Sequence, residues 1–247
     1  MEGTAVPRRL TWEVATVSAA TWETPSVRTI GLDVPAWPGH RAGQHLDVRL
    51  TAEDGYSAER SYSIASATDD PVAITVERLD DGEVSPYLTD DLRVGDQLEI
   101  RGPVGGYFAW EAADGGPLLL AGGGSGIVPL RAILRQREHS GSDTPVRLLY
   151  SARTLPELIY RDELDRHLDG VEITYTLTRE QPAGWTGYAR RVDRALLAET
   201  AWSAGKNPLA FVCGPTSFVE TVAGGLVALG YEPGRVKTER FGGTGGR

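Results

Sequence analysis

The chain has 247 residues, enough for one large domain or for two of ordinary size, each with its own core. Its apolar fraction of 40% and its charged fraction of 24% are typical of globular proteins and exclude an intrinsically disordered chain. The net charge of −9 argues against a nucleic-acid partner, and the lack of any run of about 18 apolar residues argues against membrane insertion.

The N-terminal part of the chain predicts an all-β domain, for which we expect the bounds 8–112. Alternating or β-branched runs between turn residues mark six strands, at 12–17, 26–34, 44–50, 60–65, 72–78 and 97–101. Strands at this spacing favour an antiparallel Greek-key barrel. Ser85 stands directly before Pro86, which predicts a short helix that begins with a capping hydroxyl and a proline in its first turn.

A polar and glycine-rich stretch at 111–116 separates this part from a second domain, expected at 113–243. There, apolar strands alternate with helical stretches, which implies a parallel, Rossmann-like sheet covered by helices. The expected strands are 118–121, 146–151, 171–178 and 209–213, and the expected helices begin at Ile127, Pro156, Val192 and Thr216. The last residues, 242–247, are expected to be a flexible end.

The first strand of this second domain runs into a glycine-rich turn that opens a helix. Glycines allow positive φ angles and bring no Cβ atoms, while the free N–H groups of a helix start attract a diphosphate. The turn lacks the full GxGxxG spacing, because Pro129 replaces the last glycine, and a tight turn without a ligand remains an alternative. The residues assigned to nucleotide binding are Gly122, Gly124, Ser125, Gly126, Ile127 and Pro129.

The strand at 60–65 carries an unusual set of polar residues. Arg60 and Tyr62 are expected on one face of it, and Ser61 and Ser63 on the other. For this segment alone, an ordinary barrel strand with a buried tyrosine and a surface arginine is the alternative.

Six segments in this order resemble the ferredoxin reductase superfamily. They are RSYSIAS at 60–66, GEVSPYL at 82–88, GPVGGYF at 102–108, GGGSGIVP at 122–129, CGP at 213–215 and ERF at 239–241. The resemblance runs from Trp12 to Gly243 and covers both expected domains. It implies a flavin bound between a barrel and a nucleotide domain.

For the flavin, the resemblance implies that Arg60 contacts the diphosphate, that Tyr62 packs along the isoalloxazine and that Ser63 lies near flavin N5. A neutral hydrogen-bonding group suits that position, because it does not compete for the hydride. Ser85 and its helix would supply N–H groups to the diphosphate, with capping alone as the alternative. FAD is expected rather than FMN. Further residues assigned to the flavin are Ser61, Val76, Gly82, Val84 and Phe108.

For the nicotinamide, the resemblance places Cys213 against the ring, followed by Gly214 and Pro215 at the carboxyl end of a strand. A small core residue is the alternative role for a cysteine at such a position. Glu239 would position the nicotinamide or relay protons to the flavin. Phe241 would cover one flavin face, a role left open by the six residues that follow it.

Two arginines at strand ends predict NADPH as the hydride donor. Arg153 follows the second strand of the nucleotide domain and Arg179 follows the third, where guanidinium groups suit the extra phosphate of NADPH. We note no acidic residue at these ends, as an NADH site would favour. Ordinary surface arginines are the alternative. The other members of this site are Thr178, Tyr188 and either Arg190 or Arg191.

The electron acceptor is expected to be a separate protein, because the single cysteine excludes a thiolate-ligated iron–sulfur cluster. A ferredoxin, a flavodoxin or an oxygenase component would serve, and a basic patch for it is sought among Arg8, Arg9, Arg28, Arg41 and Arg49. No metal site is expected, since the four histidines lack metal-like spacing and are interpreted as surface or loop residues. We expect a cytoplasmic monomer. The alternatives are a flavin, quinone or dye reductase and a non-catalytic flavin-binding electron-transfer subunit.

Overall fold

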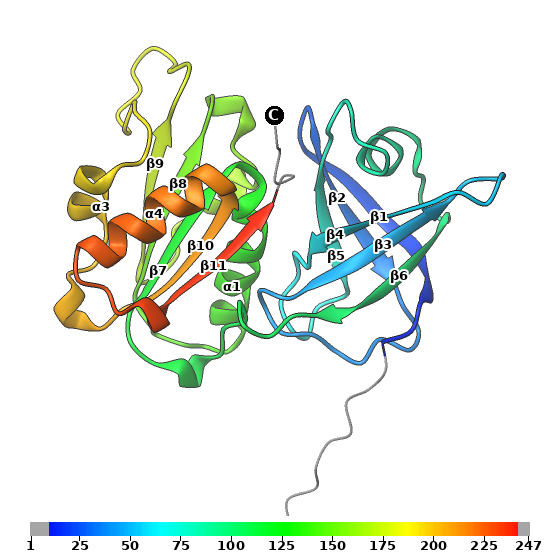
Figure 1. Ribbon diagram of the computed structural model, residues 1–247, viewed down its shortest axis with the longest axis horizontal. Coiled ribbons are helices and arrows are strands. Elements are labelled where there is room, and N and C mark those ends of the chain that lie inside the picture. The colour runs from blue at the N-terminus through cyan, green and yellow to red at the C-terminus, as the bar shows by residue number, and fades with distance from the viewer. Residues whose placement is uncertain (1–9, 242–247) are drawn as a thin grey trace, which may run out of the picture.

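The computed structural model describes residues 10–241, and its N-terminal half is a closed antiparallel barrel (Figure 1). The strand order is β4-β3-β6-β1-β2-β5, and an antiparallel bridge between Ile64 and Ile74 joins the two outer strands. The predicted Greek-key barrel is therefore confirmed. Its strands are β1 Glu13–Thr24, β2 Val27–Asp33, β3 His45–Thr51, β4 Ser57–Ser63, β5 Ala73–Glu77 and β6 Gln97–Val104.

The barrel closes around side chains that alternate along each strand, as the period of two predicts. Ile30, Leu46, Ile74 and Leu98 are at most 2% exposed and belong to one cluster. Burying each such side chain stabilises the fold by about 1.5–3 kcal/mol.

The helix predicted after Ser85 exists, but its cap does not. The short π-helix η1, Tyr87–Asp91, follows Pro86, and the Ser85 hydroxyl accepts the Leu79 N–H instead of an N–H of the helix. Arg28 holds the other end of η1, because its Nη1 donates to the carbonyl of Thr89 and to that of Leu92. The prediction of a capping hydroxyl is wrong, because the Ser85 hydroxyl is taken up by its hydrogen bond with Leu79, which closes the loop before the helix.

The second half is a parallel five-stranded sheet with the order β11-β10-β7-β8-β9. The predicted α/β fold is confirmed, with β11 as a strand that the sequence did not predict. A 3₁₀ turn, Leu155–Glu157, replaces the start of the helix expected at Pro156. The elements are β7 Leu118–Gly123, α1 Ile127–His139, β8 Val146–Ala152, α2 Arg161–Leu164, β9 Val171–Leu177, α3 Arg194–Thr200, β10 Leu209–Pro215, α4 Thr216–Ala228 and β11 Val236–Phe241.

Helices cover both faces of this sheet, because successive residues of each strand point to opposite sides. Leu118 and Leu120 pack into the cluster that includes α1, whereas Leu119 and Ala121 pack with α3 and α4. Figure 1 shows α1 on the face toward the barrel and α3 and α4 on the outer face.

A hydrogen-bonded seam joins the two halves on the side of α1 and α2. Arg135 donates to the Ala65 carbonyl at 2.6 Å, and the hydroxyls of Thr75 and Tyr160 share a buried hydrogen bond. The seam sets the position of the barrel relative to the sheet. The domain bounds 8–112 and 113–243 stay predictions, and their outer limits, residues 8 and 243, lie outside the described residues, as do Arg8, Arg9 and the end at 242–247.

Candidate active site at the domain interface

The glycine-rich turn lies at the carboxyl end of the sheet. Its first two glycines are buried residues of β7 rather than part of the turn, which consists of Gly124–Gly126 and leads directly into α1. Gly124 has a φ of +55°, a conformation that favours glycine. A Cβ on Gly126 would lie 2.1 Å from the carbonyl oxygen of Cys213, so only glycine lets the turn approach β10 this closely.

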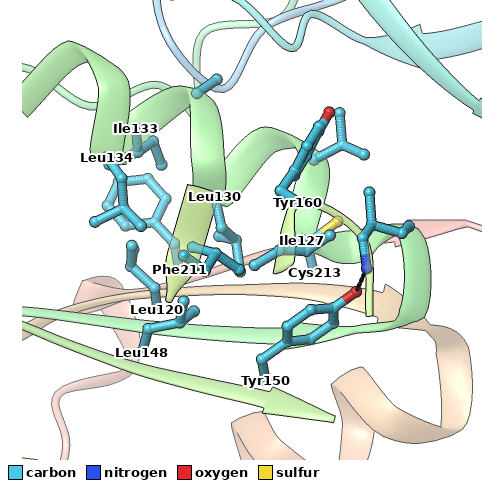
Figure 2. Packing of buried hydrophobic residues seen from close by; sticks show 14 of the residues in the cluster. Leu120, Ile127, Leu130, Ile133, Leu134, Leu148, Tyr150, Tyr160, Phe211 and Cys213 are labelled. Carbon is cyan, nitrogen blue, oxygen red and sulfur yellow. Dashed lines mark hydrogen bonds between the residues drawn. The ribbon is translucent and has the colours of Figure 1, made fainter. Parts of the chain in front are cut away.

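Cys213 therefore lies against the turn, as part of the core beneath it. Figure 2 shows its side chain in the same cluster as Ile127, Leu120 and Phe211. The thiol is 2% exposed, and burial first, then the charge of Glu239, raises its pKa. A neutral buried thiol is no nucleophile, but it is a compact surface at the end of a strand.

Glu239 is the direct neighbour of Cys213 across the β10–β11 pair. Burial raises the pKa of its carboxyl to about 7, and its Oε2 is buried without a hydrogen-bond partner. Its Oε1 lies 3.7 Å from Nδ1 of His45, on β3 of the barrel. A carboxyl that can hold a proton near neutral pH is thus placed where the two halves meet. Phe241 pairs with Pro215 at the end of the same two strands and is half-buried.

His45 brings the barrel into this site. It pairs with Ser63 in the β3–β4 register, so the predicted flavin residue and the predicted nicotinamide residues approach one another through it. Burial lowers the pKa of the His45 ring, which favours its neutral form. The prediction that His45 is an ordinary surface or loop residue is therefore wrong, because it lies on β3 and is partly buried. Pairing the strands 44–50 and 60–65 would have been the signal, since it sets position 45 opposite Ser63.

The other assigned residues of β4 have partners within the protein. Tyr62 is half-buried against the barrel core, and burial raises its pKa to about 12. The Ser61 hydroxyl donates to Asp47. Arg60 is exposed and forms an ion pair of 2.6 Å with Glu83.

Three assigned flavin residues offer no side-chain surface to a ligand. Val76 and Val84 are fully buried in the barrel core, which leaves only their backbones for contact. Phe108 packs edge-on against Phe211 at 5.2 Å and supports the site from within. Their assignment to the flavin stays a prediction, in which Val76 and Val84 would act through their backbones. Gly82 and Ser85 lie in the loop before η1.

The two strand-end arginines lie next to each other, because the Arg179 N–H donates to the Arg153 carbonyl at 2.9 Å. Both side chains are exposed, and neither guanidinium has a partner in the described part of the chain. Glu180 follows Arg179 directly, so an acidic residue does lie at the end of β9, contrary to the sequence-based expectation.

The side chains of Tyr188 and Arg190, near the end of β9, are paired with acidic residues. The Tyr188 hydroxyl donates to Glu199, and Arg190 is paired with Asp193 at 3.4 Å and with Glu199 at 3.5 Å. The guanidinium groups of Arg153, Arg179 and Arg191 have no counterion among the described residues, and all three side chains are exposed. Thr178 donates to the Ala152 carbonyl and holds the end of β9 to β8.

Two negative findings hold for residues 10–241. These residues contain no group of three or more His, Cys, Asp or Glu side chains arranged to hold a metal ion. No helix among them has both the length and the apolar character needed to cross a membrane.

Two family models match the two halves of the chain. The oxidoreductase FAD-binding domain matches residues 15–109, and the oxidoreductase NAD-binding domain matches residues 120–224. Among solved structures, the FAD/NAD-binding domain of a nitric oxide dioxygenase from Vibrio cholerae O1 biovar El Tor superposes with a TM-score of 0.84 at 25% identity, over 94% of this chain and 99% of that one.

Curated relatives agree with these matches. The ferredoxin reductase component of a 3-ketosteroid-9-alpha-monooxygenase from Rhodococcus rhodochrous is 32% identical, over 92% of this chain and 64% of its own length. NADH-cytochrome b5 reductase 1 from Candida glabrata is 30% identical, over 76% and 68%. The chain spans 62–64% of the length of the reductase components and subunits it matches. The chain belongs to the ferredoxin–NADP reductase superfamily of FAD- and pyridine-nucleotide-binding oxidoreductases.

Proposed function

We propose that the protein is a reductase that passes a hydride from NAD(P)H to FAD and then single electrons to a separate redox protein. The observation that carries this proposal is the meeting of Ser63, His45, Glu239 and Cys213 where the barrel abuts the carboxyl ends of the parallel strands. Bound FAD supplies chemistry that no side chain offers, because it accepts a hydride and releases electrons one at a time.

The residues present fit both cofactors. The turn Gly124–Gly126 carries a Cβ atom only at Ser125 and opens a helix of 13 residues, which suits the diphosphate of the nicotinamide nucleotide. Arg60 is exposed on β4 for the flavin diphosphate. Oε2 of Glu239 is a buried hydrogen-bond acceptor without a partner, and the N–H₂ group of a nicotinamide carboxamide would supply a donor for it.

Within this proposal the chain's own residues orient, exclude water and hold a proton. Cys213 is 2% exposed and its thiol is neutral, so it would line the base of a nicotinamide site without acting as a nucleophile. Ser63 offers a neutral hydroxyl. Glu239, with a pKa raised to about 7, keeps a proton at the site in much of the protein at neutral pH.

The experiment is an absorbance spectrum of the purified protein, followed by anaerobic addition of NADPH and of NADH. Flavin bands that bleach on addition of either nucleotide support the proposal. A protein that does not bind FAD, or whose flavin is reduced by neither nucleotide, contradicts it.

We propose NADPH as the preferred donor, because Arg153 and Arg179 have adjacent backbones and both carry exposed guanidinium groups without a partner among the described residues. Glu180 works against the added phosphate, and the Candida glabrata relative is named for NADH. The double variant Arg153→Ala/Arg179→Ala separates the two cases. It should raise the Michaelis constant for NADPH about tenfold or more and leave that for NADH nearly unchanged. Equal changes for both would mean that the arginines do not contact the phosphate.

For the acceptor we propose a separate one-electron protein, a ferredoxin, a flavodoxin or an oxygenase component. The single cysteine of these 247 residues supports this assignment, as does the relative named as a monooxygenase reductase component. Electron transfer from the NADPH-reduced protein to added ferredoxin, followed by its absorbance, tests it. The proposal includes a cytoplasmic monomer.

A further inference from the structure

Arg60, the arginine proposed to hold the flavin diphosphate, is occupied by a carboxylate of its own domain. Its Nη2 donates to Oε2 of Glu83 at 2.6 Å, while its Nη1 donates to the backbone carbonyl of Glu59. Glu83 belongs to the loop between β5 and η1, and Arg60 to β4. The contact therefore closes the loop onto the strand.

A second residue holds the Glu83 carboxylate in place. The hydroxyl of Tyr56, in the hairpin between β3 and β4, donates to Glu83 Oε1 at 2.7 Å. Both carboxylate oxygens of Glu83 thus have a partner, and these two hydrogen bonds lower its pKa, so the group is ionised at neutral pH. A carboxylate and a phosphate are the same kind of acceptor for a guanidinium group, and both bind in the planar, two-point geometry that arginine favours.

The loop fixes where Glu83 lies. The Leu79 N–H donates to the Ser85 hydroxyl and the Gly82 N–H donates to the Leu79 carbonyl, so residues 79–85 form a closed turn. Glu83 is about half-exposed on its rim, as is Arg60. An exposed ion pair of this kind is weak and exchanges readily with another anion.

From these contacts we infer that Glu83 is an internal competitor for the flavin diphosphate: it holds Arg60 in the FAD-free protein, gives it up when FAD binds, and thereby weakens FAD binding. The inference rests on the proposed role of Arg60. The Glu83 carboxylate would also weaken FAD binding in a second way, because its negative charge repels a diphosphate bound next to it. Residue 83 thus tunes how firmly the chain retains its flavin.

The test measures the dissociation constant of FAD from the fluorescence of flavin released when the loaded protein is diluted. Glu83→Gln keeps the shape of the side chain and removes its charge, and it should bind FAD about two- to fivefold more tightly, as expected for the loss of one exposed ion pair. Tyr56→Phe should act in the same direction with a smaller change. At about 1 M salt the difference between wild type and Glu83→Gln should shrink, because charges are screened beyond about 3 Å.

Two controls complete the experiment. Glu172→Gln also removes one negative charge from an exposed Arg–Glu pair, with Arg147, but does so in the nucleotide domain, and it should leave FAD affinity unchanged. Arg60→Met should weaken FAD binding. If it does not, the role of Arg60 is wrong and the inference fails with it. If Arg60→Met weakens binding but Glu83→Gln leaves it unchanged or weakens it too, Glu83 does not compete and the inference alone is overturned.

Discussion

The carboxyl group of Glu239 lies where its charged form is disfavoured. Burial raises its pKa from 4.5 to about 7, so the folded protein holds this proton more tightly than the unfolded chain. The stabilisation of the fold by this more tightly held proton is therefore complete below pH 4.5, and it is lost as the pH rises through 7. A variant that cannot ionise should not show this loss.

Glu239→Gln makes that difference measurable by urea unfolding at pH 5 and pH 8. Between these values, the wild type should lose about 2–3 kcal/mol of unfolding free energy relative to the variant. A difference between the two proteins that is the same at both pH values would mean that Glu239 titrates normally in the fold.

A Cys213 variant can separate two effects on the nicotinamide nucleotide: how well its ring is aligned for flavin reduction and how tightly the nucleotide binds. The wild-type thiol is neutral and buried, so in the proposed hydride transfer we expect Cys213 to help position the nicotinamide rather than to react. Cys213→Ala should slow anaerobic flavin reduction at least about tenfold and change the dissociation constant of the nucleotide less than about twofold. Cys213→Ser restores most of the volume and should recover most of the rate. Stopped-flow reduction of the alanine variant at the wild-type rate would contradict the assignment.

At the scale of elements, the glycine turn is the most constrained part of the site. A methyl group on Gly126 would meet the backbone of Cys213, which cannot move away as a flexible side chain would. Gly126→Ala should therefore destabilise the protein by about 1–3 kcal/mol and weaken nucleotide binding while FAD stays bound to the barrel. Gly224→Ala, in α4 with open space at the Cβ position, is the matched control and should be neutral or slightly stabilising. Thermal melts and nucleotide titrations compare the two, and equal behaviour would contradict this account.

The elements also divide into those that the sequence predicts and those that it does not. The strands at 44–50 and 118–121, and the helix that begins at Ile127, follow from local periodicity and turn residues. The strand β11 was missed because VKTERF is mostly polar, and it lies at the edge of the sheet, where burial is partial. Contacts between distant segments, such as His45 with Glu239 or Arg60 with Glu83, leave no local pattern in the sequence. They can be found only once the three-dimensional fold is known.

At the scale of the whole molecule, the proposed hydride transfer requires the two halves to stay aligned, and we expect the seam at α1 to provide this alignment. Arg135 donates to the Ala65 carbonyl of the barrel and forms a two-point ion pair with Glu163 of α2. Its guanidinium also lies 4.9 Å from the ring centre of Tyr160, whose hydroxyl bonds to Thr75 of β5. One arginine thus links the barrel to two helices of the nucleotide domain.

Arg135→Met keeps the apolar stem and removes the link. Glu163 retains Arg131 as a partner, so the variant should fold, with a loss of about 1–3 kcal/mol. The domains should then move relative to each other, and flavin reduction should slow several-fold, while FAD affinity should change little because the residues assigned to the flavin diphosphate, Arg60 and Ser85, lie in the barrel. Arg147→Met removes a similar arginine whose partners Glu172 and Ala201 lie within the nucleotide domain, and it should cost stability without slowing reduction. If both variants slow reduction equally, alignment does not depend on the seam but on the stability of the nucleotide domain as a whole.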